Sequence, residues 1–192
     1  MKRTLLIGFF LLLSSLPVLS VNEIQPYIQI IKNDGGKIYG AEEPRNNIKS
    51  SLRLEWFVLN DPTCPVQLLS AGVREYEQIG SYPVTYHYQA NIQLQTHEAI
   101  TAYQVKFHLY NVFGHFLDEL TVHEVRDLGA KEAYQQNEYF ARTNSRNMGA
   151  LLKVIAYITF IRKADGTMWS YNQPFIGKIM ADLTGENKKS GF

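Results

Sequence analysis

The sequence predicts an all-β protein built as a single antiparallel β-sandwich. Apolar and polar residues alternate with period two along several segments, which is the pattern of a strand with one buried and one solvent-exposed face. These segments are short, turn-forming residues separate them, and no segment shows a long helical period. Several short strands with regular turns in one domain are typical of an antiparallel sandwich.

Residues 1–20 have the features of a cleaved secretory signal peptide. A basic start, Met-Lys-Arg, precedes an apolar run over residues 5–13, and small residues precede Val21. The run is well short of the ~20 apolar residues that a membrane-spanning helix needs, so cleavage before Val21 is favoured over an uncleaved anchor. We therefore expect residues 21–192 to form one mature domain, either periplasmic or secreted.

Net charge, the lengths of the apolar segments and the cysteine content limit the kinds of partner and site that the chain can have. Loss of Lys2 and Arg3 with the signal peptide lowers the 19 basic residues to 17 against 18 acidic ones, a net charge near −1. A nearly neutral chain gives no electrostatic reason to expect nucleic acid or an anionic membrane as partner. No later segment is long and apolar enough to span a membrane. Cys64 is the only cysteine, so we expect a buried thiol, with pairing to another chain as the alternative.

Three segments alternate clearly and are predicted to be strands. They cover residues 52–58, 82–94 and 102–110, and in each the large apolar side chains share one parity. The predicted inward residues are Leu52, Leu54, Trp56 and Val58, then Tyr82, Val84, Tyr86, Tyr88, Ala90, Ile92 and Leu94, then Tyr103, Val105, Phe107 and Leu109.

Residues 151–161 are apolar on both parities, which predicts a central strand covered on both faces. A buried helix is the alternative, and the β-branched residues of the segment argue against it. Asp165-Gly166 follows, and Asp-Gly predicts a two-residue hairpin turn in which both central positions have positive φ.

Turn-forming residues bound the remaining elements. Residues 33–36, Asn-Asp-Gly-Gly, are predicted to close an N-terminal hairpin extension, and residues 60–63 to end the strand before them. Residues 131–149 are mostly polar, and we expect a loop with one short strand there. Residues 174–183 fit either a short C-terminal helix or a last strand.

The stretch Phe107-His108-Leu109-Tyr110-Asn111, followed by Gly114, joins a predicted strand to a turn. Phe107 and Leu109 point inward, Asn111 begins the reversal, and Gly114 supplies a conformation that a side chain would resist. His115 is then an exposed residue at the tip of the turn.

This motif resembles that of the FxLYD-type domains, which are immunoglobulin-like β-domains of exported bacterial proteins. The family pattern reads Phe-x-Leu-Tyr-Asp with a glycine a few residues on, and Asn111 stands where Asp is usual; both residues suit a turn. The resemblance covers residues 84–130. It implies an immunoglobulin-like sandwich in an exported protein, and the family has no common catalytic activity.

The histidines are the candidates for chemistry. His87 and His108 lie on the polar faces of strands predicted to be neighbours, where two imidazoles could bind a metal ion. No third ligand is placed by spacing, so two solvated side chains are favoured. His97 falls in a predicted turn and His123 in the following strand, and neither belongs to a metal or catalytic motif. We therefore expect no metal, no cofactor and no catalytic residue.

Tyr82, Tyr86 and Tyr88 share one face of a predicted strand, where they could stack on a sugar or a peptide. Core packing is the more usual role of such rings, as it is for Trp56 and Trp169. The sequence leaves open which of the two roles the three tyrosines have.

These observations predict an exported, non-catalytic domain that binds a protein partner in the cell envelope, through a sheet edge or the end loops. The alternative from another class is a metal-dependent or other hydrolytic enzyme that uses His87, His108 or His123. A passive structural subunit of an envelope complex is a third reading. The ligand and the oligomeric state stay open.

Overall fold

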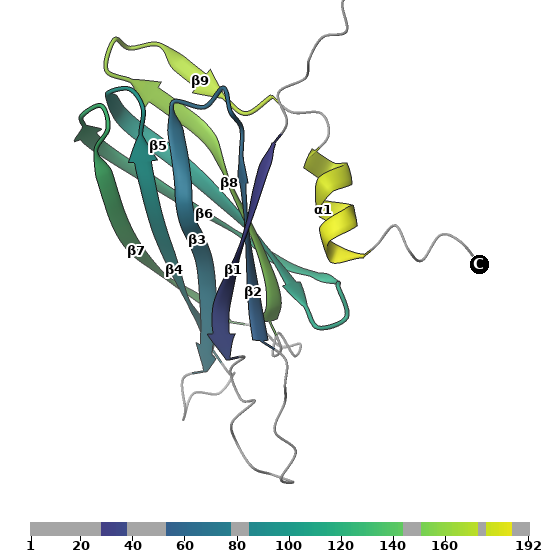
Figure 1. Cartoon of the computed structure of the whole chain (residues 1–192). Coiled ribbons are helices and arrows are strands. Elements are labelled where there is room, and N and C mark those ends of the chain that lie inside the picture. The colour runs from purple at the N-terminus through teal and green to yellow at the C-terminus, as the bar shows by residue number, and fades with distance from the viewer. Residues whose placement is uncertain (1–27, 38–52, 78–84, 144–150, 173–175, 186–192) are drawn as a thin grey trace, which may run out of the picture.

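The computed structural model describes residues 28–37, 53–77, 85–143, 151–172 and 176–185. In this part of the chain nine strands form two sheets packed face to face, and one helix lies against the outer side of the larger sheet (Figure 1). The predicted signal peptide and Tyr82 lie outside the described residues. The elements are β1 (Gln29–Lys37), β2 (Arg53–Asn60), β3 (Val66–Glu77), β4 (Thr85–Thr96), β5 (Ile100–Asn111), β6 (Phe116–Leu128), β7 (Ala133–Thr143), β8 (Leu151–Lys163), β9 (Met168–Ser170) and α1 (Ile176–Thr184).

The larger sheet has the order β1-β2-β8-β5-β6, with β9 paired to β8, and the smaller sheet has the order β3-β4-β7. The chain crosses between the sheets after β2, β4, β6 and β7, so that β4 pairs with β7 and β5 with β8. This Greek-key alternation is that of immunoglobulin-like sandwiches and confirms the predicted fold class. One pair departs from the antiparallel expectation, because β2 runs parallel to β8.

The main core fills the space between the two sheets. Every inward residue predicted from alternation whose side chain the structure describes is buried, and burial of apolar area is the main stabilising contribution to folding. Tyr88 is therefore a core residue. The buried set is Leu54, Trp56, Val58, Tyr88, Ala90, Ile92, Leu94, Tyr103, Val105, Phe107 and Leu109.

A second apolar cluster lies on the opposite side of the larger sheet, under α1. The helix resolves the two alternatives for residues 174–183, and it is held by side chains of three strands and its own Met180. β8 has buried side chains on both of its faces, which confirms the central strand predicted over residues 151–161. The cluster consists of Phe57, Leu59, Tyr110, Ile155, Tyr157 and Met180.

The turn predicted at residues 33–36 is wrong. These residues lie inside β1, which pairs antiparallel with β2 and has a bulge between Asp34 and Gly36. A Cβ atom on Gly35 would lie 2.7 Å from Trp56 Nε1, and Gly36 has a φ of 91°. The glycines therefore serve a bulge and a close approach to a buried indole, and glycine suits these two roles as well as it suits a turn.

The hairpin between β5 and β6 closes with a three-residue loop. Gly114 N–H donates to Asn111 C=O at 3.0 Å, and Asn111 N–H donates to His115 C=O at 3.0 Å. Gly114 has a φ of 80°, as a type I turn followed by a glycine bulge requires. The predicted role of Gly114 is confirmed, and His115 is exposed at the turn as expected.

The hairpin between β8 and β9 uses the same loop. Gly166 N–H donates to Lys163 C=O at 3.0 Å, and Lys163 N–H donates to Thr167 C=O at 2.9 Å. Gly166 has a φ of 87°, whereas Asp165 is not among the residues with positive φ. The hairpin was predicted correctly, but its two-residue turn was wrong because Asp165 occupies an ordinary turn position and caps Thr167 N–H with its side chain.

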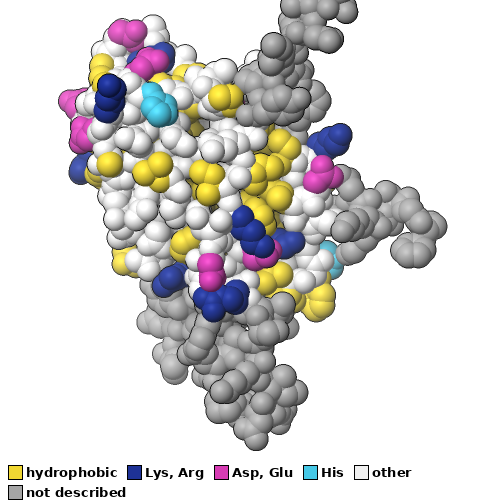
Figure 2. Space-filling model, viewed as in Figure 1, with side chains coloured by type: hydrophobic (Ala, Val, Ile, Leu, Met, Phe, Trp, Pro, Cys, Tyr) yellow, Lys and Arg dark blue, Asp and Glu magenta, His cyan; other side chains and the backbone are white. Residues whose placement is uncertain are grey.

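β7 corrects the expectation of a loop with one short strand over residues 131–149. It has 11 residues and pairs with β4 without a register shift. The strand is polar because only one of its faces meets the core, and the apolar residues that pack there are Tyr134 and Phe140. Figure 2 shows the side of the molecule on which the smaller sheet lies, with mostly uncharged polar surface over its middle.

Candidate functional site: a charged notch and an open sheet edge

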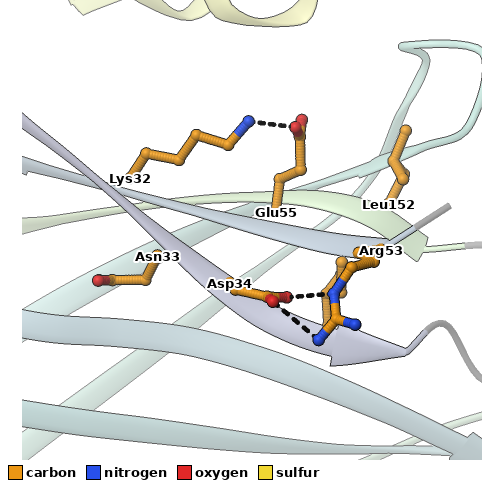
Figure 3. A pocket seen from close by; sticks show the side chains of 7 residues that line it. Lys32, Asn33, Asp34, Arg53, Glu55 and Leu152 are labelled. Carbon is orange, nitrogen blue, oxygen red and sulfur yellow. Dashed lines mark hydrogen bonds and ion pairs between the residues drawn. The ribbon is translucent and has the colours of Figure 1, made fainter.

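A notch of about 650 Å³ opens on the outer side of the larger sheet, where the end of β1 meets the starts of β2 and β8 (Figure 3). Its volume is within the range of small-molecule sites, but such sites are mostly lined by apolar side chains. Five of its seven lining residues carry a charged or amide group. The lining residues are Lys32, Asn33, Asp34, Arg53, Leu54, Glu55 and Leu152.

The charges in the notch are paired with one another. Arg53 holds Asp34 through two contacts, Nε to Oδ1 at 3.0 Å and Nη2 to Oδ2 at 2.8 Å. The hydrogen bond from Arg53 lowers the pKa of Asp34 below its ordinary value. Lys32 pairs with Glu55, whose other carboxylate oxygen lies 4.0 Å from Lys153 Nζ. Because each carboxylate already has a cation, the notch offers no unpaired carboxylate to a cationic ligand.

His108, a candidate from the sequence, does not lie on a solvated face. Its ring stacks on Tyr157 with ring centroids 5.7 Å apart, and its Nε2 lies 3.3 Å from Tyr157 Oη and 3.4 Å from Glu119 Oε2. Lys106 Nζ holds the other carboxylate oxygen of Glu119 at 2.8 Å. Burial lowers the pKa of His108, while Glu119 raises it and Lys106 lowers it. The cluster therefore favours a neutral imidazole, and the prediction of a wet side chain is wrong at this position.

The candidate histidines of the enzymatic alternative are not brought together. His87 lies in β4 and His108 in β5, so the two strands predicted to be neighbours belong to different sheets. His123 lies in β6 opposite Gln104, four residues along β5 from His108, which is about 13 Å. Among the described residues, no three His, Cys, Asp or Glu side chains are grouped closely enough to hold a metal ion.

Cys64 is buried, as predicted. Burial raises the pKa of its thiol to about 12, so almost none of it is thiolate at neutral pH. A buried, protonated thiol is a poor nucleophile and is unsuited to pairing with another chain.

The edge of β3 is sealed by side chains from β2. A strand at a sheet edge exposes backbone groups to which another strand can bind, and sandwiches block such edges. The Asn60 side chain accepts from Leu68 N–H and donates to Leu68 C=O, both at 2.9 Å. Trp56 Nε1 donates to Val73 C=O at 3.1 Å. A partner strand could reach this edge only by displacing two buried side chains.

The two outer strands of the larger sheet are irregular. β1 has its bulge at Asp34, and β6 has register shifts against β5 near both of its ends. Bulges and charges along an edge both oppose strand addition. The charged or titratable residues of β6 are Asp118, Glu119, His123, Glu124, Arg126 and Asp127.

The edge of β7 differs from the edges of β1, β3 and β6. Its pairing with β4 has no register shift, it contains no proline, and Glu138 is the only charged residue between Ala133 and Tyr139. In an antiparallel pair, alternate residues direct their backbone groups away from the partner strand, so this segment presents a row of donors and acceptors. This edge could not be predicted from the sequence, because β7 is mostly polar and lacks the alternating large apolar residues that identify the other strands.

No protein-family model matches the chain, and no curated protein matches it. Among solved structures, a hypothetical protein from Peptoclostridium difficile 630 matches part of the chain, with a TM-score of 0.41 and 9% sequence identity. The match covers 62% of this chain and 91% of that one. Within the described ranges, no helix is long and apolar enough to cross a membrane.

Proposed function

We propose that the protein is an exported, non-catalytic binding domain that takes up an extended segment of a protein partner at the edge of β7. The supporting observation is the contrast among the sheet edges. Side chains seal β3, bulges and charges interrupt β1 and β6, and β7 is regular and almost uncharged over residues 133–139. A partner strand added there would be held by backbone hydrogen bonds and would place alternate side chains on the two faces of the smaller sheet.

Export to the periplasm or the medium has separate support. Residues 1–20 have the basic start, the apolar run and the small residues of a signal peptide, and residues 107–114 resemble the motif of an exported domain family. N-terminal sequencing of the protein from the envelope fraction should give Val21 as the first residue. Recovery of intact Met1 in a soluble cytoplasmic pool would contradict export.

The enzymatic alternative has weaker support. His87, His108 and His123 lie in different places, and the nitrogen of His108 nearest to Glu119 is already in contact with Tyr157. A histidine that serves as a general base needs an unblocked nitrogen facing a substrate. For His108 and His123, no contact among the described residues favours that role.

Site-specific photo-cross-linking in the native cell tests the proposed edge. A benzophenone amino acid replaces Gln135, which is exposed on β7, and in a matched strain it replaces His123, which is exposed on the edge strand β6. We expect a discrete protein adduct from position 135 and none from position 123. In the isolated complex, the backbone amides of residues 133–139 should exchange hydrogen more slowly than in the free protein.

Three results would refute the proposed edge. One is equal adducts from both positions, and another is an adduct from position 123 alone. The third is an adduct from position 135 without slower amide exchange in residues 133–139, which would mean side-chain contact without strand addition.

A further inference from the structure

The outward side chains of β4 and β7 are of one chemical kind. In β4 every second residue faces away from the core, and its neighbours on the other parity are buried. The strand register places Gln89 beside Tyr139, Asn91 beside Asn137, Gln93 beside Gln135 and Gln95 beside Ala133. The surface formed by these residues, here called the amide face, therefore contains six side-chain amides and one phenol.

The side chains of the amide face are uncharged, and one cation borders them, the exposed Arg74 of β3, which is in register with Gln89. Glu138 is the one charged residue in the two segments that form it, and it lies opposite Ala90, on the parity of the core side. In Figure 2 the middle of this surface is uncharged, and the charged side chains gather at its upper and lower ends. The solvent-exposed face of a sheet ordinarily mixes charged residues of both signs with polar ones, so six amides and a phenol with a single cation at their border are an unusual set.

Tyr139 gives the amide face an apolar contact point. Its side chain is 63% exposed, and Gln89 Nε2 donates to its hydroxyl at 2.8 Å, which holds the ring on this surface. Gln93, Gln135 and Asn137 make no side-chain hydrogen bond to another described residue, so their donors and acceptors face solvent. Because the β4–β7 pairing has no shift, these groups repeat regularly, about 4.8 Å apart across the strands and about 6.8 Å apart along them.

We propose that the amide face binds a neutral glycan chain. A side-chain amide has two donors and an acceptor, which matches the hydroxyl groups of a sugar, since each of these also donates and accepts. A nucleic acid or an anionic lipid surface would require several cations, whereas Arg74 is the one arginine or lysine in register with this face, and an apolar partner would require a continuous hydrophobic patch. The exposed ring of Tyr139 offers a flat apolar surface to one side of a sugar ring, and the regular spacing suits a repeating polymer.

This binding is separate from the strand addition proposed at β7. The glycan contacts side chains on the face of the sheet, whereas a partner strand contacts the backbone at its edge. Gln135, the cross-linking position, also belongs to the amide face, so the two kinds of binding are distinguished by their readouts. Strand addition gives a protein adduct with slower amide exchange in residues 133–139, and glycan binding gives a retardation that Tyr139→Ala and Asn91→Ala weaken.

Affinity electrophoresis of the mature protein in gels that contain a dissolved polysaccharide tests the proposal. The probes are two neutral polymers, hydroxyethyl cellulose and glycol chitin, and the anionic carboxymethyl cellulose, which shares its backbone with the first. We expect a neutral polymer to retard the protein. Tyr139→Ala and Asn91→Ala should each weaken the retardation at least tenfold in apparent Kd. The matched control is Phe160→Ala, which removes a 47% exposed ring from β8 of the other sheet and should leave the retardation unchanged.

A thermal melt of each variant checks that the fold is kept. If Tyr139→Ala unfolds at a lower temperature than the wild type, the retardation of Asn91→Ala is the result that tests the proposal. The proposal is overturned if neither neutral polymer retards the protein, or if only carboxymethyl cellulose does, because charge would then drive the interaction. It is also overturned if Phe160→Ala weakens retardation as much as Tyr139→Ala.

Discussion

The two faces of the larger sheet are buried in different ways, and β5 has side chains on both of them. Its inward residues, Tyr103, Val105, Phe107 and Leu109, are at most 2% exposed because the second sheet covers them. On the outer face β5 carries Lys106, His108 and Tyr110, and α1 covers only part of that face. Alternate residues of β5 are therefore buried in two different environments. The inner face is covered by the whole second sheet, and the outer face by a single helix together with ring stacking and polar contacts.

The largest expected effect comes from the inner face. Phe107→Ala should lower the free energy of unfolding by about 3–5 kcal/mol, because Phe107 is fully buried between the sheets and its loss leaves a cavity. His108→Ala, one residue on, should cost about 0.5–1.5 kcal/mol, since it removes the stack on Tyr157. Urea unfolding of both variants measures the difference, and equal losses would mean that the two faces do not differ as described.

The inner face could be predicted from the sequence, and the outer face could not. Period-two alternation identifies which residues share a face, and a strand such as β5 needs only its own residues for that pattern. It does not say what covers the opposite face. His108 therefore appeared as a solvated histidine, although a helix more than sixty residues away in the sequence and a tyrosine of β8 partly enclose that side.

Two further errors share one physical cause. The Asn-Asp-Gly-Gly segment suits a turn and a bulge equally, and the packing of Gly35 against Trp56 decides between them. The sequence predicts a loop with one short strand where β7 lies, because an edge strand with one solvent-exposed face needs few apolar residues. In both cases the deciding contact comes from a distant strand. The candidate edge and the amide face depend on the register of β4 and β7, which the sequence alone does not fix.

A smaller effect is expected where α1 closes the outer face. Met180 is 8% exposed and packs in the cluster with Tyr157 and Ile155. Met180→Ala should lower the free energy of unfolding by about 2–3 kcal/mol, less than Phe107→Ala because a single helix can shift to fill the space. Lys178→Ala on the exposed side of the same helix is the control and should stay within about 0.5 kcal/mol of the wild type. If Met180→Ala leaves the urea midpoint unchanged, α1 does not stabilise the outer face.

The β5–β6 and β8–β9 hairpins have the same loop type, but only the β5–β6 turn lies against α1. Comparing the same substitution in both loops therefore shows what the contact between that turn and α1 contributes to stability. Gly114 and Gly166 both have positive φ, so valine at either position should cost about 1–3 kcal/mol. A Cβ atom on Gly114 would also lie 2.8 Å from the carbonyl oxygen of Thr184 at the end of α1, whereas one on Gly166 meets no atom within 4 Å. Gly114→Val should therefore exceed Gly166→Val by about 1 kcal/mol in urea unfolding. Equal costs would show that the β5–β6 turn does not press on the helix.

The smallest effect is a dependence on pH that belongs to the outer face. Because the pKa of His108 is lowered in the folded protein, chiefly by burial, the unfolded chain binds this proton more readily. His108 therefore contributes stability that is present above about pH 6.5 and is lost as the pH falls from there through its folded pKa. Between pH 7.5 and pH 5 the wild type should lose more stability than His108→Gln, which cannot take up the proton. Parallel profiles for the wild type and His108→Gln would mean that His108 is solvated, and that the outer face beside α1 is open to water after all.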